Sequence, residues 1–100
     1  MNRLADHVTA FNHAVTTGDW TTFAERFAAD ARMAFVGVPA GPFVGRAAIA
    51  AAYAANPPTE TMTLLDPATG QFQWAAGGTG TMSISWTPEG LVQALTVAFD

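Results

Sequence analysis

Four polar side chains are the best placed to do chemistry in this chain: His7, Asn12, Tyr53 and Gln93. His7 could act as a general base, because histidine titrates near neutral pH. Tyr53 or Gln93 could then donate a hydrogen bond to a substrate oxygen. Each residue also has a structural reading, as a helix-flank histidine, a core-edge tyrosine or an amide bonded to backbone. The sequence leaves both readings open.

The spacing of the histidines and glycines does not match a metal site or a phosphate-binding loop. His7 and His13 are six positions apart and do not share a helix face, and no histidine or glutamate stands four residues from either. Gly37, Gly41 and Gly45 are spaced by four but lack the lysine of a phosphate-binding loop. We therefore expect neither a metal nor a cofactor.

Charge and composition narrow the range of partners. The net charge is −4, there is no lysine, and the arginines are scattered rather than aligned, so we expect neither nucleic acid nor an anionic membrane as a partner. The longest apolar run, Ala47 to Ala55, is too short to span a bilayer. Met1 to His7 hold no apolar signal-peptide core, and cysteine is absent. We expect a cytoplasmic protein.

The first half of the chain predicts helices followed by a strand. One hundred residues, half of them hydrophobic, suit a single domain over residues 1–100. Apolar residues recur at helical spacing from Arg3 to Thr17, and Gly18 and Asp19 offer a C-terminal cap and the next N-terminal cap. The stripe of Trp20, Phe23, Ala24 and Phe27 predicts a second helix to about Asp30, with a strand over residues 31–38 after it.

The second half predicts one more helix and a run of strands. A short extended piece at residues 43–44 leads into a helix over residues 45–56, which Pro57 and Pro58 end. Turn signals then separate four strands, at residues 60–65, 71–76, 79–86 and 91–99. Helices first and strands last indicate an α+β domain, with three helices on one face of a curved, mostly antiparallel sheet.

The two faces of the predicted sheet differ in character. Alternation gives one face the large residues, which should meet the helices: Phe72, Trp74, Met82, Ile84, Trp86, Leu91, Gln93, Leu95, Val97 and Phe99. The opposite face holds small and polar residues: Gln71, Gln73, Thr81, Ser83, Ser85, Val92, Ala94, Thr96 and Ala98. We expect this outer face to meet either solvent or a second copy of the chain in a homodimer.

Several short segments occur in a familiar order: Gly18-Asp19-Trp20, Phe27-Ala28-Ala29-Asp30-Ala31, Gly45-Arg46-Ala47-Ala48-Ile49 with Tyr53-Ala54, and Ile84-Ser85-Trp86 with Gly90-Leu91-Val92. Their order and spacing resemble the nuclear-transport-factor-2-like superfamily, which includes SnoaL-like and ketosteroid-isomerase-like proteins. The resemblance implies a cone-shaped, cystatin-like α+β fold built around a pocket.

The resemblance also implies where isomerase chemistry would lie. The oxyanion donors and the general base of a ketosteroid isomerase would fall on Phe11, Met82 and Phe35, and all three are apolar here. A positioned base contributes roughly 10²–10⁴ in rate, and one oxyanion donor roughly 10²–10³. This chain is therefore not expected to be an isomerase of the usual Tyr/Asp/Asp type. Tyr53 matches a supporting tyrosine of that family, but its partner position is Phe11.

Three hypotheses follow, and whether the protein is an enzyme stays open. The first is a largely apolar pocket for a small hydrophobic ligand, with Gly37–Val44 as a flexible rim. The second is a SnoaL-like isomerase or cyclase that uses His7 with Tyr53 or Gln93. The third is a non-catalytic dimerisation or partner-binding domain whose pocket is filled. The residues expected to line the pocket are Phe11, Asn12, Trp20, Met33, Phe35, Tyr53, Trp74, Met82, Trp86 and Gln93.

Overall fold

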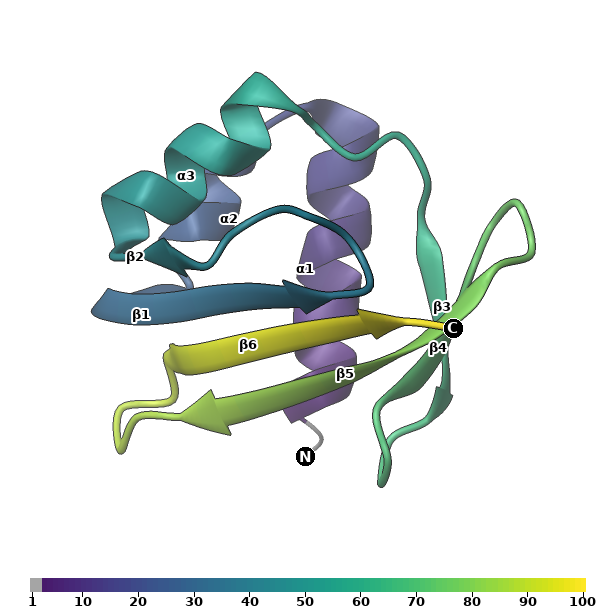
Figure 1. Cartoon of the computed structure of the whole chain (residues 1–100). Helices are drawn as coiled ribbons and strands as arrows, with labels where there is room; N and C mark the ends of the chain where they lie inside the picture. Colours follow the sequence, from purple (N-terminus) through teal and green to yellow (C-terminus); the bar gives the residue numbers. More distant parts are fainter. Residues whose placement is uncertain (1–2) are drawn as a thin grey trace.

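The protein folds as three helices on one six-stranded sheet (Figure 1). The structure is a computed structural model and describes residues 3–100. The elements in chain order are α1 (Arg3–Thr17), α2 (Trp20–Ala24), β1 (Phe27–Val36), β2 (Phe43–Val44), α3 (Arg46–Ala55), β3 (Met62–Asp66), β4 (Gln71–Trp74), β5 (Thr79–Trp86) and β6 (Val92–Phe99). The predicted α+β architecture is confirmed.

The sheet order is β2-β1-β6-β5-β4-β3. The pairing of β1 with β6 is parallel, and every other pairing is antiparallel. In Figure 1 the long helix α1 lies behind β5 and β6, while α2 and α3 lie beyond β1 at the top of the view. The helices thus cover one face of a mostly antiparallel sheet, as predicted, and leave the outer face of the central strands uncovered by helix.

The junction between α1 and α2 follows the predicted caps. Gly18 takes a φ of 78°, and its N–H donates to the carbonyl oxygen of Ala14 at 2.7 Å, which ends α1. The carboxylate of Asp19 accepts from the backbone N–H of Thr22 at 3.1 Å and from its hydroxyl at 2.7 Å. These hydrogen bonds lower the pKa of Asp19. The two helices are therefore joined by a tight, fully capped turn.

The predicted extent of the second helix is wrong. α2 ends at Ala24, and β1 already begins at Phe27. Phe27 pairs with Val92 of β6, and the N–H of Val92 donates to the carbonyl of Arg26 at 2.8 Å. Phe27 is completely buried as a strand residue, whereas its spacing from Phe23 had suggested one more helical turn. Tertiary pairing with the last strand outweighed the local helical pattern.

The predicted faces of Gln93 and Val92 are wrong, because β6 contains a bulge at this point. Trp86 pairs with Val92 and Ser85 with Ala94, so Gln93 is an extra residue on its strand. The alternation slips by one position there. Val92, predicted to lie on the outer face, is completely buried, while Gln93 is only half-buried. From Leu95 onward the predicted faces hold.

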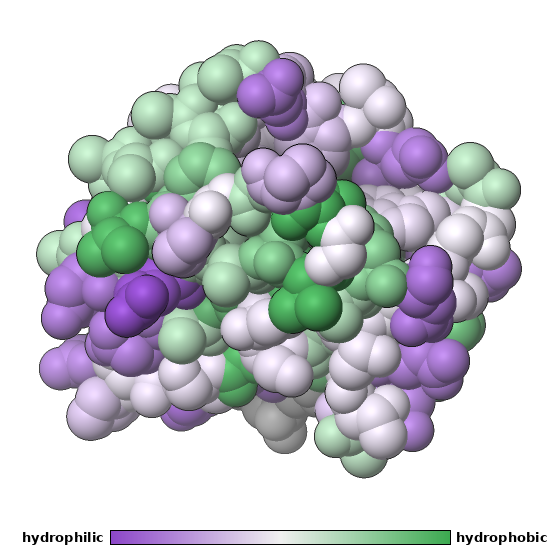
Figure 2. Space-filling model, in the orientation of Figure 1, coloured by the Kyte–Doolittle hydropathy of each residue, from purple (hydrophilic) through white to green (hydrophobic). Residues whose placement is uncertain are grey.

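The outer face of the sheet carries mostly small side chains, and part of it is apolar. Val36 and Val44 are 56% and 59% exposed there. Figure 2 shows this face, with hydrophobic residues gathered over β1, β6 and the connection between β1 and β2, and hydrophilic residues toward the edges. The inner face of the sheet carries the core.

Candidate functional site

The interior of the domain is filled by aromatic rings. Phe11 contacts Trp20, Phe23 and Trp74 with ring centres 5.6, 6.0 and 6.0 Å apart. Trp20 also stacks on Tyr53, with centres 4.7 Å apart and planes 4° apart. Phe11 and Trp20 are 5% and 6% exposed. These two residues therefore belong to the packed core, although Trp20 also borders a surface hollow of about 300 Å³ beside Thr21 and Pro57.

His7 lies inside this core rather than at the mouth of a pocket. It is 2% exposed, and its ring faces Phe23, Phe27 and Trp86 at 5.3, 6.0 and 6.5 Å. Its Nδ1 has no hydrogen-bond partner among residues 3–100. Burial, with a smaller contribution from the nearby charge of Arg26, lowers the pKa of His7 to about 4. The imidazole is consequently neutral at pH 7 and a weak proton acceptor.

The two amides both have partners within the protein. The side chain of Asn12 donates to the carbonyl of Met62 and accepts from its N–H, each at 2.8 Å. Asn12 thus ties α1 to the start of β3. The amide of Gln93 donates to a carboxylate oxygen of Asp30 at 3.2 Å, on the exposed side of the sheet. The bulge in β6 is what turns Gln93 toward Asp30 and away from the other candidate residues.

A cavity of about 530 Å³ lies between the inner side of β1, the connection from β1 to β2, and helix α3. We call it the loop-side cavity. Met33, Phe35 and Tyr53 are the three predicted pocket residues that line it. The other lining residues are Val38, Ala40, Phe43, Ala52, Ala55, Asn56, Pro58 and Phe99. Three of these come from the Gly37–Val44 segment, which the sequence had marked as a rim.

The chemical character of the loop-side cavity is almost wholly apolar. No charged side chain lines it, and its polar side chains are those of Tyr53 and Asn56. Burial raises the pKa of Tyr53, so its hydroxyl stays neutral and can donate a hydrogen bond. Phe35 faces Phe43 at 6.3 Å and stacks on Phe99 at 6.2 Å. The site can therefore cover an apolar molecule that has few polar groups.

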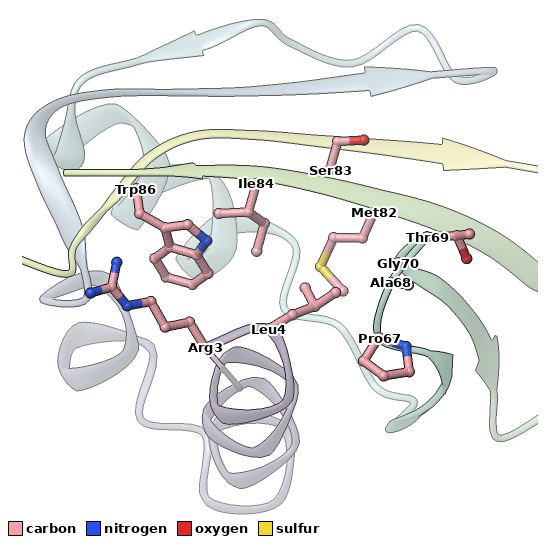
Figure 3. A pocket seen from close by; sticks show the side chains of 10 residues that line it. All are labelled: Arg3, Leu4, Pro67, Ala68, Thr69, Gly70, Met82, Ser83, Ile84 and Trp86. Carbon is pink, nitrogen blue, oxygen red and sulfur yellow. The ribbon is translucent and has the colours of Figure 1, made fainter. Parts of the chain in front are cut away.

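A second, more open hollow of about 590 Å³ lies between the start of α1, strand β5 and the turn joining β3 to β4 (Figure 3). We call it the α1–β5 groove. Its lining residues are Arg3, Leu4, Pro67, Ala68, Thr69, Gly70, Met82, Ser83, Ile84 and Trp86. Met82 and Trp86 are the predicted pocket residues among them. It shares no lining residue with the loop-side cavity.

The residues predicted to surround one pocket are thus distributed over several places. Trp74 lies apart from both cavities, stacked on Phe99 at 6.4 Å beside a smaller hollow of about 270 Å³. Sequence reasoning missed most of the α3 contribution and Phe99. The alanine-rich helix gave a usable signal, because small residues leave space beside a sheet that carries large ones. Whether any of these residues contacts a ligand stays a prediction.

Membrane-spanning and metal-binding features are not found in the described part of the chain. Within residues 3–100, no helix is both long and apolar enough to cross a membrane. The same residues contain no group of three or more His, Cys, Asp or Glu side chains that could hold a metal ion.

Comparison with known proteins identifies the family. A family model described as a SnoaL-like domain matches residues 8–100. This chain belongs to the SnoaL-like family. No curated protein matches the sequence. The family fits the observed order of helices and strands.

Three solved structures share the fold of this SnoaL-like chain. A SnoaL-like protein of unknown function from Burkholderia thailandensis has a TM-score of 0.75 and 13% identity, over 98% of this chain and 94% of that one. A protein of the SnoaL-like family from Agrobacterium tumefaciens has a TM-score of 0.68 and 19% identity, over 100% and 99%. A Mycobacterium tuberculosis protein in complex with estradiol-17beta-hemisuccinate has a TM-score of 0.69 and 14% identity, over 97% and 93%. At these identities the likeness is one of fold.

The three positions that would hold isomerase chemistry lie in three different surroundings in this SnoaL-like domain. Phe11 is in the aromatic core, Phe35 lines the loop-side cavity and Met82 lines the α1–β5 groove. Phe11 and Met82 are buried and Phe35 is half-buried. None of the three side chains can donate or accept a proton.

Proposed function

We propose that this SnoaL-like domain binds a small, neutral, hydrophobic molecule in the loop-side cavity, without an acid–base pair of the ketosteroid-isomerase kind. The observation that carries the proposal is a cavity of about 530 Å³ with no charged side chain in its lining. This volume lies within the roughly 300–1,000 Å³ usual for small-molecule sites. A charged ligand would lose its hydration there without gaining a counter-charge.

The polar groups of the cavity indicate the kind of molecule. The neutral hydroxyl of Tyr53 and the amide of Asn56 could satisfy one or two polar groups of a ligand. The Mycobacterium tuberculosis protein of the same fold has a steroid derivative bound. We therefore expect a rigid molecule of largely apolar surface with a polar group at one end.

Partly exposed apolar side chains at the mouth supply a driving force. Val38 and Phe99 line the cavity and are 41% and 36% exposed. A ligand that covers them removes apolar surface from water, at about 25 cal/mol for each Å². Met33 at the floor is already buried, at 1% exposure. Most of the favourable free energy from burying apolar surface on binding is thus expected at the rim.

Calorimetric titration with estradiol as a neutral polycyclic probe tests the proposal. Ala52→Phe places a ring in the cavity from α3, so we expect it to weaken binding at least about tenfold, which is roughly 1.4 kcal/mol. Ala51→Phe, on the exposed side of the same helix, is the matched control and should bind as the wild type does. No detectable binding by the wild type, or equal binding by the two variants, would exclude the loop-side cavity.

A catalytic role for His7 with Tyr53 or Gln93 has less support. His7 faces Phe23, Phe27 and Trp86, and it lines neither the loop-side cavity nor the α1–β5 groove. Gln93 bonds Asp30 on the exposed side of the sheet. A base and a donor that share no cavity have no common point at which to hold a substrate. We therefore base the proposal on ligand binding.

We also infer that the outer sheet face forms a homodimer. Exposed Val36 and Val44 flank a central area of small side chains, among them Ala34, Thr96 and Ala98. Such a flat face can pack on a copy of itself through a two-fold axis. Burial of the two valines would add apolar area beside these small side chains.

A further inference from the structure

We propose that the α1–β5 groove is a second ligand site, one that takes a small aromatic carboxylate. The groove lies at the start of α1, and none of its lining residues belongs to the loop-side cavity. The inference is independent of the function proposed for that cavity. It depends on the floor of the groove, on Arg3, and on the charges that surround it.

One side of the groove carries apolar side chains that are only partly covered, while Arg3, Thr69 and Ser83 add polar groups to the lining. Met82, Ile84 and Trp86 alternate along β5 and present their side chains toward α1, where Leu4 points at Met82 (Figure 3). Met82 is buried at 3% exposure, whereas Leu4, Ile84 and Trp86 are half-buried. A ring that covers these half-buried side chains would remove apolar area from water.

Arg3 places a positive charge at one end of this floor. Its guanidinium carbon lies 6.0 Å from the centre of the Trp86 ring. This distance is at the outer limit of a cation–π contact, and the guanidinium carries five N–H donors that suit an anion. Among residues 3–100, no salt bridge ties Arg3 to a carboxylate. The guanidinium thus lies beside Trp86 on an exposed side chain that a carboxylate ligand can reach.

The surrounding charges favour an anion in this place. Arg3 is the one charged side chain in the lining, although the chain as a whole carries a net charge of −4. The nearest acidic residue in the β3–β4 turn, Asp66, accepts a hydrogen bond from the N–H of Ala68 at 2.9 Å and does not line the groove. A cationic ligand would meet Arg3 unfavourably.

The apolar side chains and the charge of Arg3 together indicate the class of ligand. A hydrophilic anion such as phosphate would leave the floor of Leu4, Ile84 and Trp86 uncovered. A neutral aromatic molecule would leave Arg3 without a counter-charge. An aromatic ring that bears one carboxylate satisfies both, because its ring lies on the floor while its two oxygens meet the N–H edge of Arg3 in the paired geometry that guanidinium favours.

Methyl NMR of the methionines tests this site directly. Met82 reports on the groove, Met33 on the loop-side cavity, and Met62, which lines neither, serves as an internal reference. We expect 2-naphthoate to shift the Met82 methyl signal in a saturable way and to leave Met33 unmoved. The neutral analogue 2-naphthalenemethanol should bind about tenfold more weakly, because it lacks the charge.

Two arginine variants complete the test. Arg3→Gln should weaken 2-naphthoate about tenfold, the lower end of what a charge-assisted hydrogen bond contributes in a partly open site. It should leave the neutral analogue unchanged. Arg32→Gln removes the same charge from an exposed position on β1, outside the groove, and should leave 2-naphthoate binding as in the wild type. This pair separates a local contact from a change in net charge.

Three results would overturn the inference: no shift at Met82, equal binding by wild type and Arg3→Gln, or a shift at Met33 in place of Met82. The first two results have no bearing on estradiol binding or on Ala52→Phe, and the third concerns an anion, whereas the loop-side cavity is tested with neutral estradiol. Failure of this site and failure of the proposed function are therefore distinguishable.

Discussion

His7 makes the stability of the fold depend on pH. The pKa of this buried imidazole falls from 6.5 to about 4 on folding, so the unfolded chain binds its proton more readily. His7 therefore stabilises the fold fully above pH 6.5, and this stabilisation is lost as the pH falls toward 4. As the pH falls from 7.5 to 4.5, the lowered pKa of His7 should reduce the free energy of unfolding by roughly 2–3 kcal/mol.

Urea denaturation at those two pH values checks this prediction. His7→Leu should remove that part of the pH dependence, while His13→Leu, at an exposed position on the same helix, should leave it as in the wild type. The same pH dependence in His7→Leu and in the wild type would contradict the buried, neutral imidazole.

Asn12 is expected to be a structural residue. Its amide satisfies both the N–H and the carbonyl of Met62, so Asn12→Ala leaves two partly buried backbone groups without these partners. We expect a loss of about 2–3 kcal/mol in the free energy of unfolding, measured in urea. Gln93→Ala removes only an exposed hydrogen bond to Asp30 and should cost under about 0.5 kcal/mol. Equal stability of the two variants would argue against the role given to Asn12.

At the scale of single residues, the sequence predicted burial better than it predicted partners. Alternation correctly placed Met33 and Met82 inside, and the caps at Gly18 and Asp19 followed from residue type. The face of Gln93 was wrong, because a single extra residue in a strand reverses the alternation and no local pattern marked it. The ring contacts of His7 depend on elements distant in the sequence and could not be predicted.

Among the elements, the β3–β4 turn is the least tolerant of change. Gly70 has a φ of 81°, and its carbonyl accepts from the N–H of Met82 at 2.9 Å. A Cβ added at Gly70 would overlap the carbonyl oxygen of Met82, so neither the turn nor the strand beside it could stay in place. We expect Gly70→Ala to destabilise the fold by at least about 3 kcal/mol, measured by thermal or urea unfolding.

Gly77 provides a matched control for that substitution. It also has a positive φ, of 111°, but a Cβ there would meet no atom within 4 Å. Gly77→Ala should therefore cost only the backbone strain, about 1–2 kcal/mol. Equal losses in the two variants would show that the close approach to Met82 is unimportant.

Prediction of the elements succeeded where a pattern was long and failed where it was short. α1 and β5 have the predicted bounds, since each carries a long, regular pattern. The five-residue α2 was predicted too long, because Phe27 fits the helical stripe and the start of a strand equally well. Only the pairing of Phe27 with Val92 decides between the two, and that contact joins residues far apart in the sequence.

For the whole molecule, the outer sheet face predicts a homodimer. Sedimentation at micromolar concentration should give the mass of two chains. Thr96→Arg, which places a charge at the centre of that face between β1 and β5, should give a monomer. Thr21→Arg, at an exposed position on α2, should leave the dimer intact. A clean monomer for the wild type would remove the prediction.

The overall architecture could be predicted and the shape of the interior could not. The order of helices and strands, with their faces, sufficed for the α+β fold. Which spaces stay open depends on how Phe11, Trp20 and Tyr53 fill the volume between α1, α2 and α3, and that is set by side-chain packing. One expected pocket became a filled core with a cavity at the β1–α3 side and a groove at the start of α1.

The most direct test of the central claim is a titration of the methionine-labelled protein with estradiol, followed by methyl NMR. Met33 lines the loop-side cavity, Met82 lines the groove, and Met62 lines neither. We expect a saturable shift at Met33 alone, and we expect Ala52→Phe to abolish it. An unmoved Met33 signal, or a shift at Met82 instead, would contradict it.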